Sequence, residues 1–379
     1  MSETLTGSFF DHFATLKDPR VKRSQLHAFG DIIFIAVCAT IAGADSFTGM
    51  EAFGHEKLDW LKQFIVLTHG VPSHDTFRNV FCKIPHVQFV ACFASWVKTL
   101  NLDLDGKIVA IDGKTARGSG SAAEGKKALH MVSAWASETN LVLGQVATAE
   151  KSNEITAIPL LLKQLELQGA IVTIDAMGCQ TEIAKQIREQ GGHYILPVTG
   201  NQKHTEEDVM NAFAKMDEAT PKERAQQGVD VHETEEKGHG REDFRRIETM
   251  PAPKTMRNFD EWKDLAKICR VTRCYIEKGV EKSDVRYFIT SAGGCARSMA
   301  SWVRGHWGVE MGLHWVLDVC FGDDNSRART GDAAKNLTTL RSWVLSLLRQ
   351  AKLSKLGMRL LRQTLGWNDA KLASVLGIG

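Results

Sequence analysis

The sequence predicts an α/β protein with helical segments before and after its central sheet. From residue 107 onward, short runs rich in β-branched residues alternate with longer runs whose apolar residues recur every three or four positions. The predicted order is strand, strand, strand, helix, strand, helix, strand. The chain has 379 residues and is 43% hydrophobic, so it can hold one large domain with attachments or two to three domains.

Residues 1–105 are predicted to be mostly helical. Helix-period apolar spacing appears in residues 59–66 and 89–100, and the apolar run at 31–44 predicts a buried helix. That run is shorter than the ~20 residues that a membrane span needs, and the polar N-terminus lacks the layout of a signal peptide. We therefore expect a cytoplasmic protein with no membrane segment.

The central region, residues 106–331, contains two strands that are built alike. Each is a short β-branched run with an aspartate at or near its carboxyl end, Asp112 in the first strand and Asp175 in the fourth. Open α/β sheets place their chemistry at the carboxyl ends of strands. One such aspartate is more often a cap or turn residue, but two with the same construction favour a site. The predicted strands are 107–112, 130–138, 141–149, 172–177 and 193–198, with helices at 154–168 and 181–191.

An insertion at about residues 200–290 follows these strands. It contains a predicted helix at 204–216 and predicted strands within 229–250, 266–278 and 286–291. Such an insertion explains the long separation between Asp175 and the next acidic candidate, Glu310. Residues 332–379 form a predicted helical C-terminal segment, which is partly basic.

Glu310 lies in a stretch from Trp302 to Arg327 that is predicted to form a helix, because apolar residues recur every three or four positions. His306, Glu310 and His314 are spaced four residues apart, so all three project from one side. An acid among tryptophans is costly unless a charge partner or a metal meets it. A salt-bridged glutamate would be favoured for this helix alone. Together with the two strand aspartates, however, it favours a site in which acids bind Mg²⁺ or Mn²⁺ for two-metal phosphodiester cleavage.

Three segments resemble one known group of proteins. AIDGKTARG, VTIDAMGCQ and RGHWGVEMGLHWVLDVCF, in that order, are similar to bacterial insertion-sequence transposases of the DDE class, above all the ISAs-type, H-repeat-associated group. The segments PSHDTFRNVF, VTGNQK, KGHGR and RYFITS extend the resemblance over nearly the whole chain. It implies an RNase H-like catalytic core, and the predicted order of strands and helices independently agrees with that fold.

The resemblance also implies the chemistry. Asp112, Asp175 and Glu310 would be the catalytic residues and the ligands of two Mg²⁺ (or Mn²⁺) ions. The activity would be cleavage at the ends of the element and strand transfer into target DNA, with double-stranded DNA as partner. Synapsis of two ends would need at least a homodimer, and residues 1–105 would be a candidate module for recognising DNA ends. The predicted DNA-binding residues are Lys114, Arg117, Lys203, His239, Arg241, Arg304, His306 and His314.

The sequence departs from the wider class around Glu310. Many relatives carry Tyr and Arg seven and four residues upstream and Lys seven residues downstream, whereas this chain has Val303, His306 and Leu317. Met311 also stands where close relatives have Asn. Contacts to the DNA backbone must therefore come from other residues.

Charge and motif spacing bear on the alternatives. The net charge is only +2, but residues 295–379 carry 12 basic and 6 acidic side chains, so the basic surplus lies in and after the Glu310 helix. A catalytically silent DNA-binding remnant of a mobile element is the main alternative, although all three acids are present. A zinc protease needs H-E-x-x-H, which is absent, and the GKT at 113–115 lacks the upstream P-loop glycine, since Ile108 stands there. The eight cysteines form no C-x-x-C pair and are expected to be reduced thiols.

Overall fold

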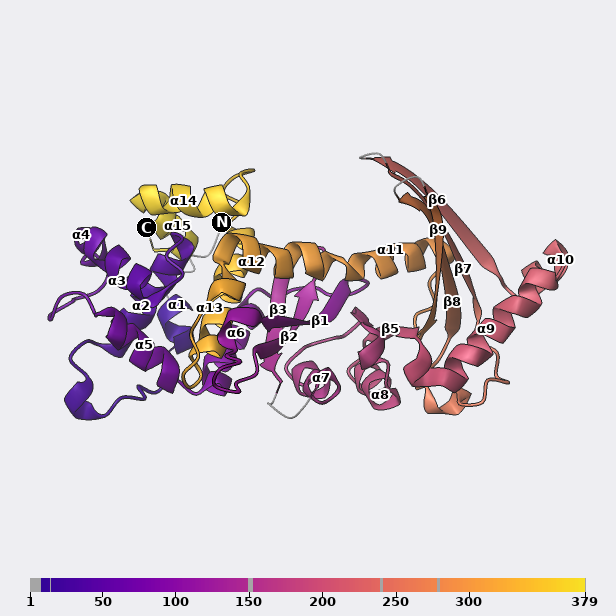
Figure 1. The fold of residues 1–379 in the computed structure, drawn as a ribbon, viewed down its shortest axis with the longest axis horizontal. Coiled ribbons are helices and arrows are strands. Elements are labelled where there is room, and N and C mark those ends of the chain that lie inside the picture. Colours follow the sequence, from indigo (N-terminus) through magenta and orange to yellow (C-terminus); the bar gives the residue numbers. More distant parts are fainter. Residues whose placement is uncertain (1–7, 14, 149–152, 239–240, 278–279, 379) are drawn as a thin grey trace.

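One nine-stranded mixed sheet extends through much of the molecule (Figure 1). The computed structural model describes residues 8–13, 15–148, 153–238, 241–277 and 280–378. The strands lie in the order β3-β2-β1-β4-β5-β9-β8-β7-β6. Their bounds are β1 Ile108–Ala116, β2 Leu129–Ala136, β3 Leu141–Ala147, β4 Ile171–Ile174, β5 His193–Val198, β6 Asp230–Gly238, β7 Arg241–Pro251, β8 Lys267–Glu277 and β9 Val280–Thr290.

The first half of the sheet carries two layers of helices. β1 pairs in parallel with β4, and β4 with β5, whereas β2 and β3 run antiparallel to their neighbours. Helices α7 (Glu154–Leu162) and α8 (Thr181–Glu189) cover one face, and apolar side chains of β1, β2 and β4 pack under them. Helix α7 is shorter than the predicted helix at 154–168. Leu165 and Leu167, which continue its apolar period, are buried in the following turn instead.

The second half of the sheet is the antiparallel meander β6–β9, which joins the first half through the β5–β9 pairing. Strand β9 begins at Val280, six residues before the predicted start at Arg286, because β8 supplies it with ladder partners from residue 277 back to 267. Helices α9 (Lys203–Glu218) and α10 (Pro221–Gln226) accompany this half of the sheet (Figure 1).

The N-terminal and C-terminal helices pack together at the opposite end of the molecule (Figure 1). Helix α2 (Phe29–Ile41) is buried from Ile32 to Ile41, because α3 (Phe47–Glu56), α13 (Ala333–Ala351) and α14 (Met358–Trp367) contact it. No single helix among the described residues is long and apolar enough to cross a membrane. Helices α5 (His74–Lys83) and α6 (His86–Thr99) together have the length and composition of a membrane span, but they are bent by 91° relative to each other. The N-terminal helices are α1 Ser8–Phe13, α2 Phe29–Ile41, α3 Phe47–Glu56, α4 Leu58–Leu61, α5 His74–Lys83 and α6 His86–Thr99.

The predicted helix around Glu310 is interrupted in the structure. Helix α11 ends at His306, a π-helical turn η6 spans Glu310–His314, and α12 continues from Trp315 to Phe321. Figure 1 shows α11 crossing from the β6–β9 sheet to the first half of the sheet. After α12 come η7 Asp323–Asn325, α13 Ala333–Ala351, α14 Met358–Trp367 and α15 Asp369–Leu376. Further 3-10 turns among the described residues are η1 Lys22–Ser24, η2 Arg117–Ser119, η3 Ala176–Gly178, η4 Gly200–Gln202 and η5 Phe259–Glu261.

Candidate active site

The two strand aspartates occupy corresponding positions on neighbouring strands. The β1–β4 ladder ends with Ile111 opposite Ile174, so Asp112 and Asp175 come next on strands that lie about 4.8 Å apart. The expected place of Asp112 at a strand end is wrong. β1 continues to Ala116 because β2 still pairs with it, whereas β4 stops at Ile174. Asp112 thus marks the point where the parallel pairing ends.

Glycines let the helical segment around Glu310 approach the sheet closely. A Cβ on Gly305 would lie 2.2 Å from Ile108 Cδ1, and one on Gly312 would lie 2.7 Å from Trp135 Cζ2. Neither space admits a side chain without displacing its neighbour. The Oγ of Ser137 also donates a hydrogen bond to the carbonyl of Gly305 at 2.9 Å. These contacts fix the height of the helix above β1 and β2, and so position Glu310.

Asp112, Glu310 and His314 meet beneath this helix. One potential ligand atom from each of the three lies within 4.8 Å of the other two. His314 Nδ1 is 3.5 Å from Asp112 Oδ2. Glu310 is exposed and His314 is buried, so the cluster has one side open to solvent. Among the described residues, Asp175 is not part of this tight group. Its Oδ1 instead accepts a hydrogen bond from the N–H of Gly178 at 3.1 Å.

Burial and mutual repulsion make this site costly for negative charge. The pKa of Asp112 is raised to about 7, first by burial and then by the charges of Glu310, Glu154 and Asp175, although the hydrogen bond from the N–H of Gly113 partly opposes them. Burial also raises the pKa of Asp175. In contrast, burial lowers the pKa of His314 to about 4, so its imidazole is neutral at neutral pH. The site therefore combines carboxylates that repel one another with a neutral nitrogen donor.

A fourth carboxylate, Glu154, also lies beside Asp112. A Cβ on Gly113 would come within 2.2 Å of Glu154 Oε1 and 2.3 Å of His130 Nε2. His130 contacts Glu154 Oε1 through Nε2 at 2.5 Å and Thr115 Oγ1 through Nδ1 at 2.8 Å. The sequence showed Glu154 only as the first residue of a predicted helix. Nothing in that pattern indicates that the start of α7 folds back against β1.

Three of the predicted DNA-binding residues face the protein interior. The Nζ of Lys114 lies 2.6 Å from Asp318 Oδ1, 3.2 Å from Asp324 Oδ1 and 3.5 Å from Asp323 Oδ2. The Nδ1 of His306 is 3.0 Å from Thr173 Oγ1. His314 belongs to the acidic cluster described above. In this conformation their polar atoms serve internal contacts, and DNA binding by them stays a prediction.

The other predicted DNA-binding residues are at the surface or outside the described side chains. The side chains of Arg117 and Lys203 are 84% and 75% exposed, and that of Arg304 is 63% exposed. His239 lies outside the described residues. The backbone of Arg241 begins β7, but its side chain is outside the described part of the structure.

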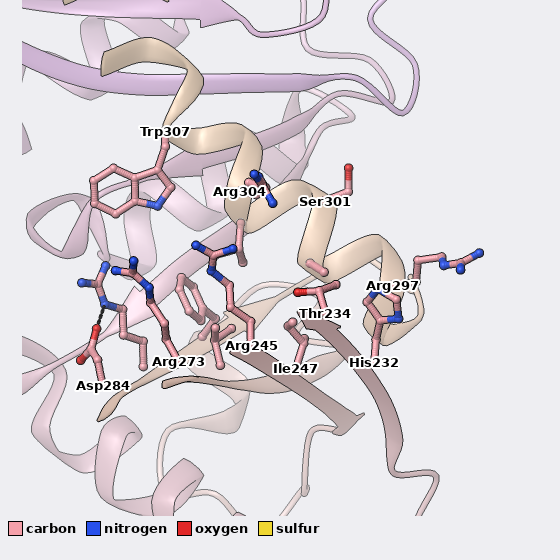
Figure 2. Close-up of a pocket in the computed structure, with 15 residues that line it drawn as sticks. His232, Thr234, Arg245, Ile247, Arg273, Asp284, Arg297, Ser301, Arg304 and Trp307 are labelled. Carbon is pink, nitrogen blue, oxygen red and sulfur yellow. Dashed lines mark hydrogen bonds and ion pairs between the residues drawn. The ribbon is translucent and has the colours of Figure 1, made fainter. Parts of the chain in front are cut away.

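A groove rich in arginine lies between α11 and the β6–β9 sheet (Figure 2). Its volume is about 560 Å³. Figure 2 shows Arg245 and Arg273 reaching from the strands toward α11, which carries Arg304, with Trp307 at one end. We call this space the basic groove, and the residues that line it are His232, Thr234, Arg245, Ile247, Val271, Arg273, Asp284, Arg286, Phe288, Arg297, Ala300, Ser301, Val303, Arg304 and Trp307.

Acidic side chains hold most of these guanidinium groups in place. Asp243 Oδ2 lies 2.9 Å from Arg245 and 2.5 Å from Arg273, and Asp284 pairs with Arg286 at 2.9 Å. Glu236 bridges Arg245 and Arg304 and thereby ties β6 to α11. Arg297 is exposed and makes no ion pair within the described part of the chain. The groove thus carries five arginines against three paired acids.

Comparison with known proteins assigns the chain to a family. Residues 102–347 match the family described as "Transposase DDE domain", and residues 10–97 match the one described as "DDE_Tnp_1-associated". The chain belongs to the DDE transposase family. It is 39% identical to "Putative transposase YncI" of Escherichia coli O157:H7 over 97% of this chain and 94% of that protein. It is 37% identical to "H repeat-associated putative transposase YhhI" of Escherichia coli strain K12 over 97% of both chains.

Within this DDE transposase, the family match of residues 102–347 runs from just before β1 to within α13. It includes the acidic cluster, the basic groove and the whole nine-stranded sheet. The associated segment, residues 10–97, covers most of the N-terminal helices. Among solved structures, a synaptic complex of piggyBac transposase with hairpin DNA shows 11% identity and a TM-score of 0.43, a likeness too low to support a conclusion.

Proposed function

We propose that this chain is a DNA transposase that cleaves at the ends of an insertion sequence and transfers the freed strand into target DNA. The observation that carries the proposal is the meeting of Asp112, Glu310 and His314 beside the position of Asp175. The strand order β3-β2-β1-β4-β5, with helices on both faces, supports an RNase H-like core for this chemistry.

The donor set fits divalent cations that prefer oxygen ligands. Asp112, Asp175 and Glu310 would hold two Mg²⁺ or Mn²⁺ ions. When bound, such ions lower the pKa of the attacking water or hydroxyl and stabilise the departing 3′-oxygen. The raised pKa of Asp112 is the expected sign of a site whose carboxylates lack a counter-charge. The fit of these residues thus rests on observed proximity and on their electrostatics.

Asp112 and Asp175 are each oriented by a backbone N–H close by in the sequence, whereas Glu310 is positioned by the packing of its turn on the sheet. The N–H of Gly113 donates to Asp112 Oδ1 at 2.9 Å, and that of Gly178 donates to Asp175 Oδ1 at 3.1 Å. Glu310 lies in the π-helical turn, and Gly312 of the same turn packs against Trp135. These contacts leave further carboxylate lone pairs for ligands and hold the acids in a geometry that the reaction needs before DNA arrives.

We infer that the basic groove binds the DNA backbone next to this site. α11 lines the groove and leads into the turn that carries Glu310. DNA bound in the groove would therefore be held at a fixed position relative to the acidic cluster. Phosphates would replace Asp243, Asp284 and Glu236 as partners of the arginines. Arg117 and Lys203 are exposed and would add outlying contacts. Synapsis of two element ends would require a homodimer.

The test is cleavage of a supercoiled plasmid that carries the element's own ends, in Mg²⁺ and in Mn²⁺, by the wild type and by Asp112→Asn and Glu310→Gln. We expect metal-dependent breaks at the ends that both substitutions abolish. End binding without cleavage by the wild type would instead support a catalytically silent DNA-binding remnant. Equal cleavage by wild type and variants would refute the assignment of these acids.

A further inference from the structure

His314 has the features of a ligand that lacks its partner. Its side chain is 9% exposed, and its Nε2 has no hydrogen-bond partner among the described residues. A buried polar atom without a hydrogen-bond partner destabilises the folded state, so it calls for an explanation such as a bound ion. The ring faces the acids through its other nitrogen, Nδ1, which is 3.5 Å from Asp112 Oδ2, a separation longer than that of an ordinary hydrogen bond.

The backbone around His314 is shaped for this position. Glu310 and His314 are the first and last residues of the π-helical turn η6. A π-helical turn inside an α-helix is rare and is found mainly at functional sites. Here it brings one carboxylate and one imidazole of the same turn to within 4.8 Å of each other and of Asp112. An oxygen-only site would need no imidazole at this place.

We propose that His314 is a metal ligand of the acidic site, so that one ion is held by two carboxylates, Asp112 and Glu310, and one imidazole nitrogen. The proposal rests on the proposed function, because it assigns a ligand to the same metal site. Carboxylates suit Mg²⁺ and Mn²⁺ alike, whereas imidazole nitrogen favours first-row transition metals. The position next to Asp112 therefore prefers Mn²⁺ over Mg²⁺.

The two other histidines near the site provide matched controls. His306, two turns upstream, is paired through its Nδ1 with Thr173 Oγ1. His130 uses both ring nitrogens, one on Thr115 and the other on Glu154. Only His314 combines membership of the tight cluster with an unpartnered buried nitrogen in the described structure. A nitrogen signal from the metal should therefore depend on His314 and not on the other two.

The experiment uses the full chain, stripped of metal and loaded with up to one equivalent of Mn²⁺, with no DNA present. Pulsed electron paramagnetic resonance detects ¹⁴N coupled to the bound Mn²⁺. We expect this coupling in the wild type, its change to ¹⁵N coupling when histidine is ¹⁵N-labelled, and its loss in His314→Gln. His306→Gln and His130→Gln should retain it. Mn²⁺ affinity should fall about tenfold or more in His314→Gln, and Mg²⁺ affinity by less.

The outcomes separate this proposal from the proposed function. Mn²⁺ that binds in an Asp112-dependent way without nitrogen coupling in the wild type would overturn the role of His314 and leave the metal site standing. Coupling that disappears in His130→Gln instead would also overturn it. Absence of any Asp112-dependent Mn²⁺ binding would overturn the metal site itself. If His314→Gln does not fold, the labelled wild type still tests for a histidine ligand, and coupling retained in both His306→Gln and His130→Gln leaves His314 as the histidine of the site.

Discussion

Replacing Asp112 by asparagine should stabilise the metal-free protein, and the gain should depend on pH. The pKa of Asp112 is raised from 3.8 to about 7, chiefly by burial and then by Glu310, Glu154 and Asp175. One pKa unit corresponds to about 1.4 kcal/mol, so the ionised carboxylate costs the folded state up to about 4 kcal/mol relative to the unfolded chain. Because the folded state binds the proton more tightly, this cost is absent below pH 3.8, grows as the pH rises, and is complete above pH 7.

The assay is urea denaturation of wild type and Asp112→Asn in EDTA at pH 5 and at pH 8. We expect the variant to exceed the wild type by about 2–4 kcal/mol at pH 8 and by clearly less at pH 5, since asparagine removes the repelled charge and keeps the side-chain volume. Excess Mg²⁺ should raise the stability of the wild type and leave the variant nearly unchanged, because ligand binding to the native state stabilises it.

The control for this prediction has the opposite sign. Burial alone would raise the pKa of Asp208, but its bonds to Arg257 lower it, so Asp208→Asn should reduce stability at pH 8. An Asp112→Asn variant that is less stable than the wild type at pH 8 would refute the reasoning. A difference that is the same at both pH values would refute it as well, because titration of this carboxylate is the stated cause.

Three further predictions concern the fold and the DNA interface. Asp323→Asn should lower the free energy of unfolding by about 3 kcal/mol in a denaturation assay, because it leaves the buried guanidinium of Arg341 without its carboxylate. The control Asp75→Asn, at an exposed ion pair, should change the free energy of unfolding by under about 0.5 kcal/mol. Gly312→Ala should destabilise the chain by about 1–3 kcal/mol and reduce plasmid cleavage, because the new Cβ would meet Trp135, whereas Gly293→Ala, with open space around it, should do neither. Arg297→Ala should weaken binding of any DNA duplex and reduce the slope of log affinity against log salt by about 1 in a fluorescence titration. The control Arg188→Ala on α8 should leave this slope unchanged. An unchanged slope in Arg297→Ala would show that Arg297 does not contact the DNA.

Local patterns in the sequence were enough to predict several parts of the site. The strands that carry Asp112 and Asp175, the helical character around Glu310 and the order of elements from 107 to 198 all follow from apolar periodicity. Side-chain periods report how the backbone repeats, and they do so reliably where strands are buried and β-branched.

Other features depend on contacts between segments far apart in the sequence. The π-helical turn at Glu310–His314 arises where the helix is pressed against Trp135 and Ile108, and no period in the chain encodes it. The internal ion pairs of Lys114 with three acids could not be read from a GKT sequence that looks exposed and basic.

The sequence by itself thus determined which acids lie on which elements and the family to which the chain belongs. Tertiary structure alone decided which side chains share one site. It brought Glu154 against Gly113, turned His314 toward Asp112, and assembled the arginines of the basic groove from β7, β8, β9 and α11. The physical reason is that periodicity is a property of neighbouring residues, whereas the cost of burying a charge is set by whatever atoms the fold places around it.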